Sequence, residues 1–517
     1  MRRATLGLWI VLFAAGVSAD VKPSPLFSDH VVLQSGMSVP VWGTADAGEK
    51  VTVTFQGQSQ AAIASADGKW ILRLKNLKPG GPFEMTIAAH NSITVKDVLV
   101  GEVWLGSGQS NMQFTVSKAK ASFAGLINEE QEIAAADYPQ IRMFTVKSSK
   151  TYEPQTELQG EWLICNPENV PGFSAVGYLF SRDLHRELKQ PVGFITSAFG
   201  ASTAESWIRR ETIAADPLLT PMLDHFDAQV KFFREKPDAP ADQAPAPPAT
   251  INARPGAPPQ KQRDPVQDQH NPTVLFNGMI KPLIPYAIRG VIWYQGESIV
   301  GGKEGVALYS HVQETLIKDW RKLWGEGDLP FYVVQLAALQ NHSNNPLVRE
   351  GQAAVLALKN TGMAVTIDIG DPKDVHPHNK APLGERLTLI ALANVYGHKI
   401  EYSGPVYESM KVAGNAIRLK FSHASGLMAK DGALKWFVIA GADQKFFPAE
   451  ARIEVDKNGG DTIVVRSSEV DAPVAVRYAW DNYPEGCNLY NGAGLPAAPF
   501  RTDRWAYDYT PAPQRTE

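Results

Sequence analysis

Residues 101–112 read Gly-Glu-Val-Trp-Leu-Gly-Ser-Gly-Gln-Ser-Asn-Met, and this stretch decides how the rest of the chain is organised. An apolar run that begins near Val98 predicts a strand, which ends at small residues and gives way to a helix. Such a turn presents one hydroxyl, that of Ser110, at the edge of a sheet beside free backbone N–H groups. The stretch therefore indicates a nucleophilic serine, although a serine that only caps a helix would give the same pattern.

The chain from Val98 to about Gly397 alternates between apolar strands and amphipathic helices. Further strands are expected over 192–195, 290–294, 331–336 and 363–369, and helices over 173–188, 305–323, 348–358 and 383–396. Continuous apolar strands separated by helices predict an α/β fold, a doubly wound parallel sheet covered on both faces. Ligands of such sheets lie beyond the carboxyl ends of the strands, where one crevice would hold Ser110, Gly200, Gln295 and residues 371–376.

All-β regions flank this catalytic domain, which is expected over residues 98–398. Short strands separated by Gly, Pro and Asp predict a β-sandwich over residues 20–97, in which Asp67-Gly68 indicates a hairpin. Residues 399–517 predict a second β region that packs on the catalytic domain. Residues 236–271 are rich in Pro, Ala, Gln and Asp, and this composition predicts a disordered insertion.

The first 19 residues are typical of a cleavable signal peptide, with Arg2 and Arg3, an apolar stretch and Val17-Ser18-Ala19 before the cleavage point. The apolar stretch is shorter than the roughly 20 residues that cross a bilayer, so no membrane anchor is expected after cleavage. We therefore expect a secreted or periplasmic protein. Its formal charge of −4 gives no support to nucleic acid as a partner, and the pattern does not give the oligomeric state.

Three blocks of sequence, in this order, carry a resemblance to a known family. They are Gly108-Gln-Ser-Asn-Met112, Trp293-Tyr-Gln-Gly-Glu-Ser298 and Asp374-Val-His-Pro377. The chain resembles, from about residue 26 to 502, the sialate O-acetylesterase-like carbohydrate esterases of the SGNH (GDSL-like) hydrolase superfamily. The resemblance implies a serine esterase that removes O-acetyl groups from sialic acids or from plant-wall polysaccharides. The alternative is a carbohydrate-binding protein on a hydrolase scaffold without activity.

The catalytic residues expected on this basis are Ser110 as nucleophile and His376 as base. His376 lies on a polar loop after a strand, and His378 is a second candidate nearby. Superfamily members commonly carry an Asp three residues before the histidine, where this chain has Lys373. Residues two apart in an extended segment share a face, which favours Asp374 over Asp371 as the orienting acid. A Ser–His dyad stays open.

The resemblance assigns the oxyanion hole to the backbone N–H groups of Ser110 and Gly200 and to the side-chain amide of Gln295. Glycine brings its N–H close to a ligand without a Cβ in the way, and an amide donates without adding a competing base. Gln295 stands where superfamily relatives carry Asn. Glu297 is interpreted as a brace for the same loop, outside the catalytic set.

No metal-ligand cluster, Walker loop or dinucleotide motif occurs in the sequence, so neither a metal nor another cofactor is expected. Cys165 and Cys487 are the two cysteines, and they would form either one disulfide or two buried thiols. The aromatic residues near the three blocks would stack on a sugar or, more commonly for strand residues, fill the core. These residues are Trp104, Trp207, Trp293 and Tyr294.

Overall fold

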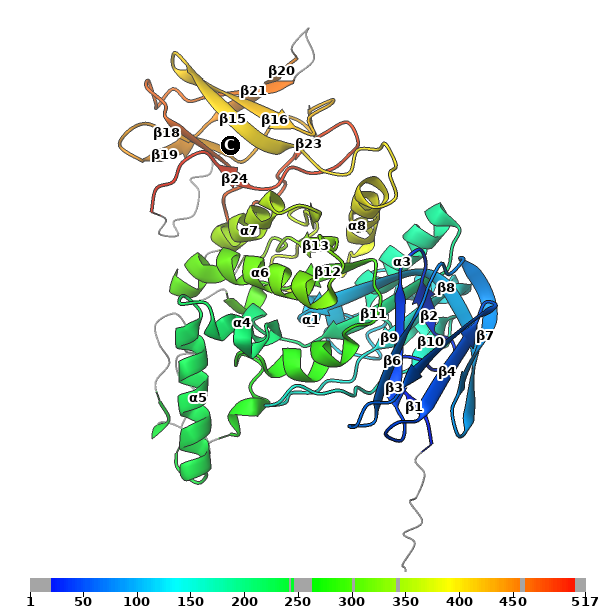
Figure 1. The fold of residues 1–517 in the computed structure, drawn as a ribbon. Coiled ribbons are helices and arrows are strands. Elements are labelled where there is room, and N and C mark those ends of the chain that lie inside the picture. Colours follow the sequence, from blue (N-terminus) through cyan, green and yellow to red (C-terminus); the bar gives the residue numbers. More distant parts are fainter. Residues whose placement is uncertain are drawn as a thin grey trace, which may run out of the picture.

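The computed structural model describes residues 20–240, 243–245, 263–299, 303–340, 345–455 and 461–506. Figure 1 shows a central α/β domain with N-terminal strands, in blue, and C-terminal strands, in orange and red, on different sides of it. The predicted signal peptide lies outside the described residues, as do residues 241–242 and 246–262 of the predicted insertion. The end of that insertion, residues 263–271, contains a short helix (Pro265–Gln267) with Val266 buried, which differs from the expectation of disorder.

The central sheet has the strand order β10-β9-β11-β8-β12-β13-β14. All neighbours are parallel except β10, which pairs antiparallel with β9 at the edge. The strands are β8 (Ser92–Gly108), β9 (Tyr138–Thr145), β10 (Trp162–Cys165), β11 (Val192–Ala198), β12 (Gly290–Tyr294), β13 (Phe331–Val334) and β14 (Thr361–Ala364). The predicted parallel sheet is confirmed.

Helices cover both faces of this sheet. Successive strand residues point to opposite faces, so each strand contributes side chains to two separate cores. Trp104, Phe194 and Ile292 share one core with α3 (Ala175–Leu188) and α8 (Ala381–Asn394). Leu105, Ile195 and Val291 share the other core with α6 (Lys303–Trp324) and α7 (Asn345–Ala354). The remaining α-helices described are α1 (Ser110–Gln113), α2 (Glu129–Ala134), α4 (Arg210–Ala214) and α5 (Thr220–Glu235). The arrangement is the doubly wound one that the sequence predicts.

Strand β8 belongs to the N-terminal β region as well as to the central sheet. Its first half pairs with β7 (Gly80–Ala88) and β2 (Val32–Gln34), and its second half pairs with β11 and β12. Strand β7 also pairs with β4 (Lys50–Phe55), which pairs with β5 (Gln58–Ile63). A second sheet contains β1 (Lys22–Pro23), β3 (Val39–Thr44) and β6 (Lys69–Leu74).

The turn at Asp67-Gly68 joins strands of different sheets. Gly68 has the positive φ of 76° that a tight turn requires, as predicted. However, β5 pairs with β4 and β6 pairs with β3, so the turn is a corner between the two layers. The predicted hairpin is wrong, because the turn residues specify the local reversal of the chain and not the sheet that each strand joins.

The C-terminal strands form two four-stranded sheets and a short ribbon. Their members are β15 (Val406–Ala413), β16 (Ala416–Ser422), β20 (Glu450–Glu454) and β21 (Thr462–Arg466); β18 (Phe437–Ala440), β19 (Phe446–Pro448), β22 (Ala475–Tyr478) and β24 (Phe500–Arg501); and β17 (Met428–Ala429) with β23 (Leu489–Tyr490). Arg349 of α7 joins this region to the central domain. Its buried guanidinium donates to the carbonyl oxygens of Asp481 at 2.7 Å and Asn482 at 2.9 Å.

Burial settles two alternatives that the sequence leaves open. Cys165 and Cys487 are both buried and are not linked to each other. The four aromatic residues named above are all at most 1% exposed, so they belong to the core and present no ring to a sugar. None of the described helices combines the length and the apolar character that crossing a membrane requires.

Candidate active site

Ser110 is the first residue of α1 and follows directly on β8. Gly108 makes this turn possible, with a φ of +127°. A Cβ at Gly108 would lie 2.1 Å from the carbonyl oxygen of Tyr294 on the neighbouring strand β12. A side chain at this position would therefore push the two strands apart, and glycine places Ser110 at the carboxyl edge of the sheet.

The other predicted site residues gather at the same edge. Gly200 follows β11, Gln295 follows β12, and His376 lies in the loop between β14 and α8. A Cβ at Gly200 would lie 3.7 Å from the Cβ of Ser110, so the Gly200 turn packs directly beside the hydroxyl-bearing residue. The parallel sheet thus brings together residues that are up to 266 positions apart in the sequence.

Ser110, His376 and Asp374 form a continuous chain of polar contacts. The Oγ of Ser110 lies 2.8 Å from Nε2 of His376. The other ring nitrogen, Nδ1, lies 3.4 Å from Oδ1 of Asp374, and the same oxygen accepts the backbone N–H of His376 at 2.8 Å. Burial lowers the pKa of His376, partly against the attraction of Asp374. A neutral imidazole so placed can accept a proton from the serine hydroxyl.

Asp371 and His378, the alternative candidates for the orienting acid and the base, have other hydrogen-bond partners. Oδ1 of Asp371 accepts the backbone N–H groups of Lys373 at 2.7 Å and Asp374 at 2.9 Å, so this carboxylate stabilises the turn before His376. His378 contacts the carbonyl oxygen of Gly125 through Nδ1 at 2.5 Å. Its Nε2 lies 3.3 Å from Oδ2 of Asp374. The histidine in contact with Ser110 is therefore His376 and not His378. The acid in contact with Nδ1 of His376 is Asp374 and not Asp371.

The three predicted oxyanion donors differ in their availability. Among the residues that the structure describes, none accepts a hydrogen bond from the backbone N–H of Ser110 or of Gly200. The side chain of Gln295 is completely buried, and its Nε2 donates to the carbonyl oxygen of Ser202 at 3.1 Å. Its Oε1 accepts the hydroxyl of Tyr309 at 3.1 Å. An oxyanion role for Gln295 rests on its second amide hydrogen and stays a prediction.

A buried polar network behind Ser110 was missed by the sequence reasoning. The ammonium of Lys380, which is 1% exposed, donates to Oδ1 of Asn111 at 2.5 Å. The Nδ2 of Asn111 donates to Oε1 of Glu297 at 2.5 Å and to the carbonyl oxygen of Val375 at 3.0 Å. Asn111, Glu297 and Val375 belong to the three sequence blocks in turn, so this network ties the blocks together.

Burial gives the network unusual titration properties. It lowers the pKa of Lys380 to about 7, against the attraction of Glu297. It also raises the pKa of Glu297, against a hydrogen bond from Asn111. The sequence carried no clear signal for Lys380, because the helix predicted over 383–396 begins three residues after it. In the structure Lys380 directly precedes α8, a position where the helix dipole disfavours a positive charge.

The segment between α1 and α2 contacts both His376 and His378. The ring of Phe123, which is 36% exposed, lies 4.8 Å between centroids from the ring of His376. Ile127 is 76% exposed, and its backbone N–H donates to the carbonyl oxygen of His378 at 3.2 Å. Phe123 therefore presents an exposed aromatic ring beside the imidazole of His376.

Comparisons with known proteins agree with this geometry. A family described as "Carbohydrate esterase, sialic acid-specific acetylesterase" matches residues 269–392. The sialate O-acetylesterase of Mus musculus is 30% identical, over 91% of this chain and 92% of the mouse protein. The chain belongs to the sialate O-acetylesterase family. The human sialate O-acetylesterase is 29% identical, over 92% of this chain and 90% of its own length.

A solved structure extends the likeness to three dimensions. A carbohydrate acetylesterase from Xanthomonas citri is 35% identical to this esterase and superposes with a TM-score of 0.79, over 94% of this chain and 100% of the other. The family and the fold class expected from the sequence are thus confirmed, and the protein is a carbohydrate O-acetylesterase. Within the described parts of the chain, no group of three or more His, Cys, Asp or Glu side chains is placed to hold a metal ion.

One pair of variants distinguishes between Asp374 and Asp371 as the acid that orients His376. We expect Asp374→Asn to lower kcat/KM on an aryl acetate by about tenfold to a hundredfold, because the variant no longer holds an anion beside Nδ1 of His376. Asp371→Asn should cost clearly less, since an amide oxygen still accepts the two backbone N–H bonds. Steady-state kinetics of both variants test this. The reverse order would assign the orienting role to Asp371, and two mild losses would favour a dyad.

Lys380 offers a test through the pH profile. The positive charge of Lys380 lowers the pKa of His376, as does His378, whereas Asp374 raises it. In Lys380→Met the pKa of His376 should rise, so the acid limb of kcat/KM moves to higher pH and kcat falls by roughly tenfold or more. Lys373→Met is the matched control, because this exposed lysine lies three residues from His376 but is screened by solvent. Identical profiles in both variants would contradict the coupling.

Proposed function

We propose that the esterase releases acetate from O-acetylated carbohydrates through a covalent acetyl-enzyme on Ser110. The observation that carries this proposal is the contact of 2.8 Å between Oγ of Ser110 and Nε2 of His376, with Asp374 on the other ring nitrogen. A nucleophile, a base within hydrogen-bond reach and an acid that orients the base are the parts that acyl transfer needs.

The reaction follows from this geometry in two halves. Oγ of Ser110 attacks the acetyl carbonyl carbon while Nε2 of His376 takes the hydroxyl proton. The carbonyl oxygen becomes an oxyanion, which the N–H groups of Ser110 and Gly200 stabilise, with Gln295 as the predicted third donor. Collapse breaks the bond to the sugar oxygen, which receives the proton from His376. Water then attacks the acetyl-enzyme by the same route and releases acetate.

The residues around Ser110 support a small acyl group. The turn at Gly200 packs against the nucleophile, because a Cβ there would lie 3.2 Å from Oε1 of Gln113 as well as 3.7 Å from Ser110. Ser202 and Thr203, which follow it, are buried. A methyl group needs little room on this side, whereas a long acyl chain needs an apolar channel.

The sugar side favours a neutral glycan over an acetylated sialic acid. The exposed charged residues of the loop before His376 are Asp371, Lys373 and, partly exposed, Asp374. They carry one net negative charge, which disfavours a carboxylate bound directly against this loop. The exposed ring of Phe123 beside His376 offers a surface for the C–H face of a sugar ring. We therefore favour acetylated plant-wall polysaccharides as the substrate class, and export guided by residues 1–19.

The role of Ser110 is tested by removing its hydroxyl. We expect Ser110→Ala to lower kcat for an aryl acetate by about a thousandfold or more while the melting temperature stays unchanged. Ser467→Ala, in the C-terminal region, is the control and should keep full activity. Near-normal turnover in Ser110→Ala would reject this serine. Absence of acetate release by the wild type from every acetylated glycan tried would favour the non-catalytic binding alternative.

The acyl specificity distinguishes an acetylesterase from a lipase-like enzyme. On a series of aryl esters, we expect kcat/KM to fall steeply from acetyl to butyryl and to be negligible at octanoyl. The physical reason is the packed turn at Gly200, since each methylene forced against a rigid wall costs about 1–3 kcal/mol. Initial rates across the series measure this. Rates that stay level or rise with chain length would refute the acetylesterase proposal even with Ser110 as nucleophile.

A further inference from the structure

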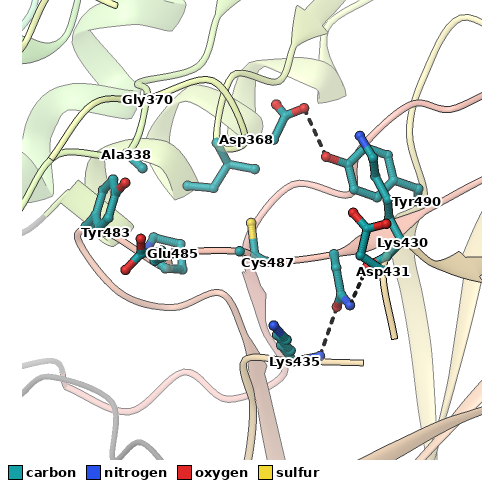
Figure 2. A pocket seen from close by; sticks show the side chains of 14 residues that line it. Ala338, Asp368, Gly370, Lys430, Asp431, Lys435, Tyr483, Glu485, Cys487 and Tyr490 are labelled. Carbon is teal, nitrogen blue, oxygen red and sulfur yellow. Dashed lines mark hydrogen bonds between the residues drawn. The ribbon is translucent and has the colours of Figure 1, made fainter. Parts of the chain in front are cut away.

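A cavity of about 300 Å³ lies between the central domain and the C-terminal β region, apart from the contacts around Ser110. Figure 2 shows it from close by, with Asp368 and Gly370 on the side of the central domain. The C-terminal region contributes Lys430, Lys435 and the segment 483–488 to the lining. Its volume is at the lower end of the range for small-ligand sites and suits a group of the size of one sugar ring.

The cavity lies along the same sheet edge as the nucleophile. Asp368 and Gly370 follow β14, and the chain continues from them directly into the loop that carries His376. The six residues from Gly370 to His376 reach at most roughly 20 Å when fully extended. The turn stabilised by Asp371 makes the actual span shorter. The cavity and the catalytic histidine therefore lie within the reach of a short oligosaccharide.

The walls carry groups that recognise hydroxyls. Asp431, Lys435 and Glu485 have exposed side chains, and within the described part of the chain these side chains form no hydrogen bond or ion pair. The hydroxyl of Tyr490 donates to Oδ2 of Asp368 at 3.0 Å, and Lys430 lies 5.3 Å from the centroid of the Tyr490 ring. Carboxylates accept, and ammonium groups donate, hydrogen bonds of the kind that sugar hydroxyls form in both directions.

The charges around the cavity balance. Lys430 and Lys435 line the cavity together with Asp431 and Glu485, while Asp368 is already paired with Arg386 at 2.7 Å. A balanced set of charges gives no preference for an anion or a cation. Tyr483, which is half-buried in the wall, adds an aromatic surface that suits the C–H face of a ring. A neutral, polyhydroxylated ligand fits this combination.

We propose that the cavity is a sugar-binding subsite that holds a further unit of the glycan whose acetylated unit lies at Ser110. The inference rests on the proposed function and makes it more specific, because it selects a neutral oligosaccharide or polysaccharide over a single acetylated sugar. The C-terminal β region then contributes directly to substrate binding through Asp431, Lys435 and Glu485.

The test compares acetylated oligosaccharides of one neutral plant-wall glycan, from a single unit to several. For the wild type, we expect kcat/KM to rise about tenfold from the shortest to the longest substrate, through a lower KM. In the double variant Asp431→Ala/Glu485→Ala, the ratio of kcat/KM for the longest substrate to kcat/KM for the shortest should fall to near one. The reason is that two acceptors for sugar hydroxyls are lost. Asp443→Ala/Glu469→Ala removes two exposed carboxylates of the same region outside the cavity and should keep the wild-type ratio.

Two results would overturn the subsite. One is a wild-type kcat/KM that does not change with substrate length, and the other is a length dependence that survives in Asp431→Ala/Glu485→Ala. Either result leaves the assignment of Ser110 intact, since that assignment is measured with an aryl acetate. Conversely, full activity of Ser110→Ala on an aryl acetate would reject the proposed mechanism whatever the dependence on substrate length.

Discussion

The continuity of β8 is the constraint on which the rest of the molecule depends. This strand begins in the N-terminal β region, runs through the middle of the central sheet and ends at Gly108, two residues before Ser110. Its second half fits between β11 and β12 only because Gly106 and Gly108 bring no side chains, as a Cβ at Gly106 would lie 2.5 Å from the Phe194 ring. The direction of β8 therefore fixes where the serine lies, and the N-terminal region cannot be removed without cutting this strand.

Buried polar groups also connect segments of the chain that are distant in the sequence. Asn111, the residue after the nucleophile, is hydrogen-bonded to the loop that carries the base. Lys380 and Glu297 are hydrogen-bonded to the same side-chain amide. Arg349 likewise connects α7 to the C-terminal region through hydrogen bonds from its buried guanidinium. Buried charges of this kind add little net stability when they are paired, but the loss of one partner leaves the other uncompensated. Such networks favour one arrangement of the site over its near alternatives.

The sequence was sufficient for the elements whose signal is local. Apolar periodicity predicted the central strands and helices, and the order of three blocks at strand ends predicted that Ser110 and His376 would meet. The burial of Lys380 was beyond such reasoning, because a lysine is buried only when tertiary neighbours supply its partners. The orientation of the Gln295 amide toward Ser202 and the assignment of β5 and β6 to different sheets depend likewise on contacts between distant segments.

The separate, buried cysteines bear on how the protein matures. Burial raises the pKa of both thiols, Cys165 and Cys487, to about 12, so neither is ionised to the reactive thiolate at neutral pH. Hydrogen bonds and apolar packing, such as the contacts of Arg349, join the C-terminal region to the central domain. Folding of this chain therefore requires no oxidant, no disulfide isomerase and no particular redox poise. Reducing agents should leave the fold intact, and an active enzyme can form equally well in a reducing or an oxidising environment.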